Sequence, residues 1–325
     1  MKTYEYPLKT GITRTREFER KKLATHAVNV GIRCGHECTY CSTPSLLRMH
    51  PAFKALGLKP FDRGYAIVDP ATPERVALDA QRIKKRGMVQ LCTTVDAWSP
   101  EAQKYDLGRR CLEAILAHPG WCVRILTKNA AVAKDFDLIE RHRDRVLVGL
   151  RITALPVQER VIAAIEPNAS PITERMAVLR EAHRRGLRTY AMFCLLLPKI
   201  ACTAHDVDRL VRFAVECGTE EIFAEPVNPR GPGLRLTLEA LGPSRHPDAF
   251  CGVCPIRRRE EWSWYVAKLL HLLQDSIRAH SNINRLRFLL YPSRLIQEKL
   301  DEIRRDDAGV IWLGKEAAQP EANHA

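Results

Sequence analysis

Three cysteines stand close together in Arg33-Cys34-Gly35-His36-Glu37-Cys38-Thr39-Tyr40-Cys41, with the spacing C-x3-C-x2-C. In a chain of 325 residues with eleven cysteines, this spacing arises by chance about 0.01 times. The thiolates could hold three corners of a cubane iron–sulfur cluster and leave one iron open, or they could bind zinc with His36 as the fourth ligand. We favour the cluster, because His36 lies inside the same short loop, whereas structural zinc sites usually draw their ligands from two separated pairs.

Short apolar runs alternate with helical patterns on both sides of this loop. The runs that predict buried strands are residues 27–32, 88–93, 123–127, 146–153, 189–197 and 221–224. This alternation predicts parallel βα units, in either a doubly wound sheet or a barrel-like array. In a barrel, functional residues lie at the carboxyl ends of the strands, and the candidates described below follow these runs directly.

Helix signals fall between the predicted strands. Apolar residues recur at helical spacing in 207–215, and three Ser/Thr-Pro pairs, at 72–73, 99–100 and 170–171, predict helix starts with a capping hydroxyl. Residues 259–300 are rich in aromatic and leucine residues, and we expect a helical region that packs onto the core. The tail after residue 306 is rich in alanine and acidic residues, and we expect it to be flexible.

The charge is strongly positive and unevenly distributed. The chain has 51 Lys and Arg against 38 Asp and Glu, a net charge of +13. Residues 1–33 carry 8 basic and 3 acidic side chains, and residues 257–305 carry 11 and 6. Concentrated positive charge suggests a polyanionic partner such as nucleic acid, and a solvated basic surface is the equal alternative. Without a long apolar segment or a secretory signal, the protein is expected to be cytoplasmic, where disulfides are rare.

With these motifs in place, the chain resembles the radical S-adenosylmethionine (AdoMet) enzymes, and within them the spore photoproduct lyase-like branch. The resemblance spans about residues 25–225 and rests on the cysteine motif and on the following segments: Cys92-Thr93-Thr94-Val95-Asp96, Ala97-Trp98-Ser99-Pro100, Leu107-Gly108-Arg109-Arg110-Cys111-Leu112-Glu113, Leu126-Thr127-Lys128-Asn129, Lys134-Asp135-Phe136-Asp137-Leu138, and Glu166-Pro167-Asn168-Ala169-Ser170-Pro171 with Arg175.

The resemblance implies both a fold and a chemistry. The implied fold is an α/β partial (β/α)6 TIM-type barrel with parallel strands, plus a C-terminal helical region. Residues 1–25 would form a basic extension, 26–228 the barrel core, 229–305 a Cys-pair loop and helical region, and 306–325 a flexible tail. In this family a 4Fe-4S cluster on three thiolates, here Cys34, Cys38 and Cys41, binds AdoMet. An electron donor such as flavodoxin or ferredoxin then drives its cleavage to a 5′-deoxyadenosyl radical, which abstracts hydrogen from the substrate.

The resemblance also implies cofactor-binding positions. Tyr40 matches the aromatic residue that lies against the adenine. Thr93, Thr94 and Asp96 end the second strand, where the family meets the methionyl group, and a carboxylate there could bind its ammonium. Lys128 matches a lysine that contacts AdoMet, plausibly as a carboxylate partner.

The fourth strand departs from the branch. A serine commonly stands where Arg151 aligns, which puts ribose recognition in doubt, and Thr153 is expected to point to the same face and to substitute for it. Glu166 and Arg175 match the branch motif, and we expect them to form an ion pair that holds their loop. Cys92 lies close to where spore photoproduct lyase keeps a cysteine that returns a hydrogen atom to the product radical. The alternative for Cys92 is a buried strand cysteine.

A second cysteine pair, Cys251-Gly252-Val253-Cys254, has C-x2-C spacing. Two thiolates at this spacing can share a metal if partners such as Cys202 or Cys217 complete the site. Two free thiols in a tight turn are the alternative.

Three functions remain open at this point. The first is a radical AdoMet enzyme acting on nucleic acid, such as a lyase of a DNA photolesion. The second keeps the radical chemistry but takes a peptide, a tRNA or a small metabolite as substrate. The third is a non-enzymatic metal-binding module, which would be colourless, whereas an iron–sulfur protein is brown.

Overall fold

The predicted strands join one large sheet in the computed structural model, which describes residues 1–228 and 231–314. In order across the sheet the strands are β2 (Thr13–Arg14), β3 (His26–Val28), β6 (Met88–Leu91), β7 (Cys122–Thr127), β8 (Val146–Arg151), β9 (Arg188–Phe193), β10 (Ile222–Ala224), β11 (Leu286–Leu290) and β12 (Val310–Trp312). Every neighbouring pair from β3 to β12 is parallel, and β2 runs antiparallel to β3. The expected α/β, TIM-type arrangement of parallel strands is therefore confirmed.

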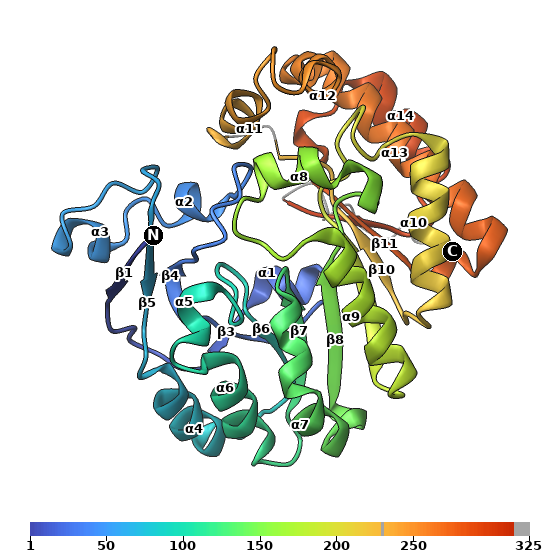
Figure 1. Cartoon of the computed structure of the whole chain (residues 1–325). Helices are drawn as coiled ribbons and strands as arrows, with labels where there is room; N and C mark the ends of the chain where they lie inside the picture. The colour runs from blue at the N-terminus through green and yellow to red at the C-terminus, as the bar shows by residue number, and fades with distance from the viewer. Residues whose placement is uncertain (229–230, 315–325) are drawn as a thin grey trace, which may run out of the picture.

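Helices connect the successive strands and cover the outside of the arc that they form (Figure 1). Those between β5 (Tyr65–Val68) and β12 are α4 (Thr72–Arg82), α5 (Pro100–Gln103), α6 (Leu107–Leu116), α7 (Phe136–Arg141), α8 (Glu159–Ile165), α9 (Ile172–Arg184), α10 (Ala204–Glu216), α11 (Gly233–Leu241), α12 (Pro247–Val253), α13 (Arg259–His280) and α14 (Gln297–Arg305). Short 3-10 turns occupy Ala130–Asp135, Arg143–Arg145, Pro156–Gln158, Cys254–Arg257, Ile283–Arg285 and Pro292–Arg294. The predicted apolar face of α10 is confirmed, because its members at 207, 210, 211 and 214 are buried.

The Ser/Thr-Pro pairs mark helix starts correctly, but their hydroxyls do not cap them. Ser99 precedes α5, yet its Oγ donates to Glu101 Oε1 at 2.6 Å. Ser170 lies just before α9, and its Oγ accepts from the backbone N–H of Ala130 at 2.9 Å. The local pattern placed the helix starts within a residue or two, but the hydroxyls bond a nearby carboxylate or a distant backbone group, and Thr72 Oγ1 has no partner among the described residues.

The predicted strand 27–32 is two strands. Its first half is β3 in the large sheet, and its second half, β4 (Gly31–Arg33), pairs with β5 (Tyr65–Val68) in a small sheet that also contains β1 (Lys2–Glu5). The backbone of β5 passes so close to Gly31 that a side chain there would collide with the carbonyl of Ile67. The cysteine loop therefore begins at the end of β4 in the small sheet, and α2 (Thr43–Leu46) and α3 (Pro51–Ala55) follow it (Figure 1).

The large sheet extends beyond the segment 26–228 at both ends. Strand β2 and helix α1 (Arg16–Arg20) lie in the basic N-terminal segment. At the other end, β11 and β12 occupy parts of the chain that we expected to be helical or flexible, a correction that follows from their pairing with β10 and with each other. The rest of the expected flexible tail, residues 315–325, and residues 229–230 lie outside the described residues.

The core fills the space between the sheet and its helices. Tyr190, Phe193, Phe223 and Phe288 are completely buried on neighbouring strands. A smaller core, which includes Ile32 and Phe53, lies under the small sheet. None of the helices in the described part of the chain combines the length and the apolar character needed to cross a bilayer.

Candidate functional site

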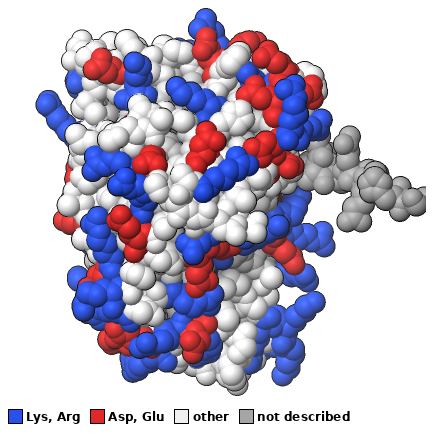
Figure 2. Space-filling model, turned by 90° about the vertical axis from the view of Figure 1, so that its right-hand side faces the viewer, with Lys and Arg blue, Asp and Glu red and all other residues white. Residues whose placement is uncertain are grey.

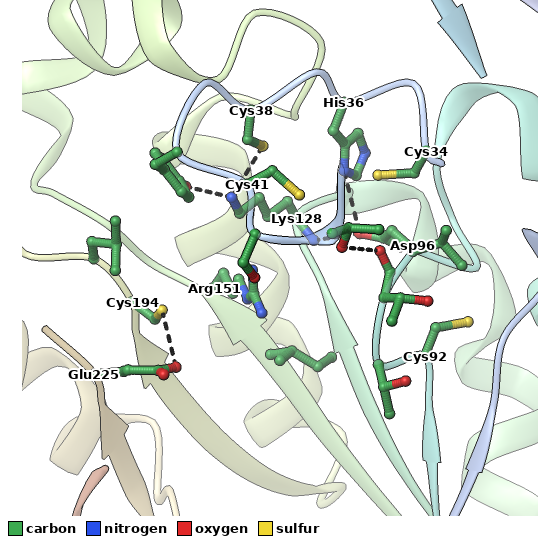
Figure 3. Close-up of a pocket in the computed structure, with 18 of the residues that line it drawn as sticks. Cys34, His36, Cys38, Cys41, Cys92, Asp96, Lys128, Arg151, Cys194 and Glu225 are labelled. Atoms are coloured by element: carbon green, nitrogen blue, oxygen red, sulfur yellow. Dashed lines mark hydrogen bonds and ion pairs between the residues drawn. The ribbon is translucent and has the colours of Figure 1, made fainter. Parts of the chain in front are cut away.

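A cavity of about 930 Å³, partly open to solvent, lies beneath the cysteine loop at the carboxyl ends of β6 to β10. We call it the inner cavity. Ten of the eleven predicted site residues line it, namely Cys34, Cys38, Tyr40, Cys41, Cys92, Thr93, Thr94, Asp96, Lys128 and Arg151 (Figure 3). The fold thus brings together residues that are up to 117 positions apart in the sequence.

Thr153 is the exception. It is buried and its hydroxyl has no hydrogen-bond partner, but it is not among the residues that line the inner cavity. The prediction assumed that side chains would keep alternating along the strand. Strand β8 ends at Arg151, so the alternation no longer governs position 153.

The cysteine loop is fastened by groups from distant elements. The backbone N–H of Gly35 donates to the Glu101 carboxylate at 3.0 Å, and its carbonyl accepts from Asn168 Nδ2 at 2.8 Å. The backbone N–H of Thr39 donates to the carbonyl of Ile165 at 2.9 Å. These bonds hold the loop open over the cavity, and sequence reasoning overlooked Glu101 because it follows a proline that reads only as a helix start.

Asp96 links three elements at the floor of the cavity. Its carboxylate accepts from Thr127 Oγ1 at 2.8 and 2.9 Å, and from the backbone N–H groups of Trp98 and Lys128 at 2.9 Å each. Nδ1 of the buried His36 lies 3.5 Å from the same carboxylate. With these partners, Asp96 fixes the ends of β6 and β7 and turns His36 inward, a role beyond the expected contact with the AdoMet ammonium.

Thr93 and Thr94 are positioned by Asn29, a residue that the sequence analysis did not single out. Asn29 Oδ1 accepts from the backbone N–H groups of both threonines at 2.9 Å, and its Nδ2 donates to Thr93 Oγ1 at 2.8 Å. Asn29 sits at the break between β3 and β4. Its position as a polar residue inside an otherwise apolar run was the sequence signal that could have identified Asn29.

A buried ionic network lies beside Cys38. Lys128 Nζ is 3.1 Å from Cys38 Sγ and 3.1 Å from Glu166 Oε1, and it also donates to the Tyr40 hydroxyl, which itself donates to Glu166. Glu166 pairs with Arg175 at 2.5 Å, which confirms the expected ion pair. Although burial opposes ionisation, Arg175 and Lys128 hold the pKa of Glu166 well below its ordinary value. Burial likewise opposes the charge on Lys128, but Cys38 and Glu166 raise its pKa overall.

Two further thiols line the inner cavity. Cys92, at the end of β6, is buried next to Cys111, and burial raises its pKa well above the ordinary value. Cys194 follows β9 on the opposite side, and its Sγ lies 3.9 Å from Glu225 Oε2 (Figure 3). The pattern of apolar residues in 189–197 gave no sign that Cys194 and Glu225 would meet here.

The donor set fits a cluster with one open iron. The thiols of Cys34, Cys38 and Cys41 are partly buried on one loop and face one cavity, where each would hold a different iron. The Lys128 ammonium beside Cys38 favours the thiolate that iron requires. Within residues 1–228 and 231–314, no three His, Cys, Asp or Glu side chains are grouped as ligands of a single ion.

A second, larger cavity adjoins the first. This outer chamber, about 1500 Å³ including space open to solvent, shares Ser42, Thr93, Leu126, Arg151, Glu225, Pro226 and Asn228 with the inner cavity. Its other walls come from α1, from α13 and from the ends of β9 and β11, and they include Phe18, Met192, Trp262 and Tyr291. A molecule in the outer chamber would therefore lie directly against the inner cavity.

The Cys251/Cys254 pair lines neither cavity. Cys251 is exposed and Cys254 is half-buried, while Cys202 and Cys217 are buried. All cysteines of the chain fall in the described residues, and each is a free thiol. No metal-binding group of three side chains includes this pair among the described residues.

The arc of parallel strands, with a cavity at their carboxyl ends, defines a TIM-type α/β fold. Within this class, the structure is similar to spore photoproduct lyase complexed with dinucleoside spore photoproduct (TM-score 0.56, 16% identity, covering 86% of this chain and 79% of that one). A variant of that lyase with bound AdoMet and dinucleoside spore photoproduct matches equally well (TM-score 0.56, 16% identity, 85% and 78% covered). The chain therefore has a spore photoproduct lyase-like fold, as the sequence resemblance implied.

In sequence, the chain is 25% identical over 219 residues to the uncharacterized protein ORF301 of Acidianus two-tailed virus. The match covers 66% of this chain and 71% of that protein. No family model matches the chain.

Proposed function

We propose that the protein is a radical AdoMet enzyme. The observation that carries this proposal is the set of three thiols of Cys34, Cys38 and Cys41 on one loop, facing a cavity at the carboxyl ends of parallel strands with Lys128 against Cys38. A 4Fe-4S cluster in this loop, with AdoMet on its open iron, supplies the one-electron cleavage that yields a 5′-deoxyadenosyl radical. An external electron donor such as flavodoxin or ferredoxin is the proposed source of that electron.

The chain's own residues position the cofactors and exclude water. Lys128, with its ammonium held by Glu166 and Tyr40, would supply positive charge for the AdoMet carboxylate. Thr93 and Thr94, fixed by Asn29, present the end of β6 to the methionyl group. Tyr40 and the mostly buried walls of the inner cavity keep solvent from a reactive intermediate.

We further propose that the substrate is a nucleic-acid lesion and that Cys92 returns a hydrogen atom to the product radical. Three features support this substrate class: the resemblance of the sequence to the spore photoproduct lyase-like branch, the similarity of the fold to a lyase bound to a dinucleoside photoproduct, and the basic flanks of the chain. The alternative substrates are a peptide, a tRNA or a small metabolite. The deuterium-transfer assay described below would identify one of these if its hydrogen, and not that of a nucleic-acid lesion, appears in 5′-deoxyadenosine.

Anaerobic reconstitution with iron and sulfide, followed by AdoMet and dithionite, tests the proposal. We expect a brown protein that forms 5′-deoxyadenosine, and deuterium transfer from the labelled substrate into that product. Replacement of Cys34, Cys38 and Cys41 by Ala should abolish both colour and cleavage, whereas Cys251→Ala/Cys254→Ala should leave both intact. An iron-free wild-type protein, or a single zinc ion in the loop, would overturn the proposal in favour of a metal-binding module.

A further inference from the structure

Arg151 places a positive charge at the boundary between the two cavities. It is the last residue of β8 and lines both the inner cavity and the outer chamber. Its side chain is half-buried, and its Nε is buried without a hydrogen-bond partner among the described residues. Figure 3 shows Arg151 between the cysteine loop and the Cys194–Glu225 pair.

The other cations at this boundary are already matched. Lys128 contacts Glu166 and Cys38. Lys21 lies 3.9 Å from both Glu17 and Glu225. Glu225, which also contributes to the field at Arg151, is thus shared with Lys21 and with the Cys194 thiol.

A guanidinium that is half-buried, with its Nε buried and unpaired, is costly. Buried charges in folded proteins are compensated by an ion pair, by hydrogen bonds or by a bound ligand. A planar guanidinium offers a fork of N–H donors that matches the two oxygens of a carboxylate or phosphate. The side chain that usually stands at this position in the resembled branch, a serine, has neither the charge nor the fork.

The outer chamber suits an anion that carries an apolar or aromatic body. Phe18, Trp262 and Tyr291 contribute aromatic surface, and Met192 and Leu289 contribute aliphatic surface. Arg294, the other arginine in its wall, also has a buried Nε without a partner among the described residues, but its Nη2 donates to the carbonyl of Arg257 at 3.2 Å, so part of its hydrogen-bonding capacity is used. Arg151 therefore offers the least engaged donors at the place where the chamber meets the inner cavity.

We propose that Arg151 binds an oxyanion, a phosphate or a carboxylate, of the molecule that occupies the outer chamber. The inference rests on the proposed function insofar as this molecule is the substrate whose hydrogen the radical abstracts. An oxyanion held at this boundary would fix the substrate by one end and leave its neighbouring atoms facing the inner cavity. The residue would thereby set substrate specificity by charge.

Calorimetric titration of the reconstituted protein without reductant tests the inference, with inorganic phosphate and benzoate as probes. We expect Arg151→Gln to weaken the binding of at least one probe by about ten-fold or more, the loss expected for a charge-assisted hydrogen bond. Arg151→Lys, which keeps the charge but not the fork, should weaken it less. Arg294→Gln removes the same charge from the same chamber and should change binding by less than about two-fold.

Two results would overturn the inference. The first is equal probe binding by the wild type and its three variants, or an equal weakening of probe binding in Arg151→Gln and Arg294→Gln. Either outcome would show that the probes respond to the general positive charge of the chamber and not to Arg151. The second is a loss of AdoMet affinity in Arg151→Gln with unchanged probe binding, because it would assign the guanidinium to the AdoMet carboxylate. Circular dichroism checks that each variant folds. If Arg151→Gln does not fold, the comparison of Arg151→Lys with wild type tests the inference in its place. Since no AdoMet is cleaved in the titration, its outcome is independent of whether wild-type protein forms 5′-deoxyadenosine.

Discussion

Cys92 shows how the environment of one residue can suit it to hydrogen transfer. Its thiol is buried at the wall of the inner cavity, where burial raises its pKa well above the ordinary value. The thiol therefore keeps its hydrogen at neutral pH, and a weak S–H bond is what a hydrogen-atom donor needs. Cys194 lines the same cavity, where burial raises its pKa to about 11, so two protonated thiols face the space in which a product radical would form.

We expect Cys92→Ala to leave AdoMet cleavage within about two-fold of wild type but to change the products formed from the substrate, because the radical would be quenched by another route. Liquid chromatography with mass detection of 5′-deoxyadenosine and of substrate-derived products measures both. Cys111→Ala is the matched control, since Cys111 is a buried neighbour of Cys92 that does not line the cavity. An unchanged product distribution in Cys92→Ala would end the hypothesis.

Glu166 is a residue whose contribution to stability can be measured directly. Its carboxylate is fully buried between Arg175 and Lys128, so Glu166→Gln leaves two buried cations without their partner. We expect a loss of about 3–5 kcal/mol in the free energy of unfolding, determined by urea titration. Glu181→Gln, which breaks a surface pair with Arg184 and Arg185 at the C-terminal end of α9, should have little effect. Equal losses in the two variants would contradict this reading.

At the scale of elements, helix α6 is tied by charge to the 3-10 turn Ala130–Asp135 and to helix α7, which follow β7. Arg109 of α6 donates to both carboxylate oxygens of Asp137 at 2.9 and 3.0 Å, and to Asp135 at 3.3 Å. Asp135 also accepts from Trp98 Nε1 at 2.7 Å. These contacts join segments on either side of β7 and thereby support the strand end that carries Lys128.

The same contact predicts a dependence of stability on pH. The hydrogen bonds from Arg109 lower the pKa of Asp137 from 3.8 to about 2. Because the folded pKa is the lower one, the pair stabilises the fold above pH 3.8, and its contribution is lost as the pH falls toward 2. Thermal melting of wild type and Asp137→Asn should therefore differ at pH 5 and converge at about pH 2. A difference that persists unchanged at the acid end would show that the pair does not act through this ionisation.

At the scale of the whole molecule, the two basic flanks of the chain meet. The Tyr291 hydroxyl, after β11, donates to Glu17 of α1, and Lys21 Nζ lies 5.6 Å from the centre of the Tyr291 ring. Segments about 270 positions apart thus close one side of the outer chamber. On the face that carries the C-terminal helices, Lys and Arg are interleaved with Asp and Glu rather than gathered into one field (Figure 2). On this face, a polyanion would therefore be attracted by individual Lys and Arg side chains and not by one extended positive surface.

If the substrate is nucleic acid, we expect the protein to bind thymine-rich DNA with an affinity that falls at least ten-fold between about 50 and 200 mM salt, because bound phosphates release counterions. Fluorescence anisotropy of a labelled oligonucleotide measures this, with an uncharged peptide-backbone analogue as the control. Absence of binding at low salt would argue against a DNA lesion and in favour of a small substrate.

The amino-acid sequence by itself determined the cysteine loop, the alternation of strands and helices, and most of the inner cavity's residues. These features are local: three ligands within eight positions, apolar runs of a few residues, and polar residues directly at strand ends. Only the tertiary structure decided that 27–32 splits into two strands, that β11 and β12 complete the sheet, and that Thr153 leaves the cavity. It also decided that Arg151 Nε is left without a hydrogen-bond partner among the described residues while Glu225 is shared with Lys21. Such outcomes depend on which distant groups a side chain meets once the strands are aligned, and no local pattern specifies those distances.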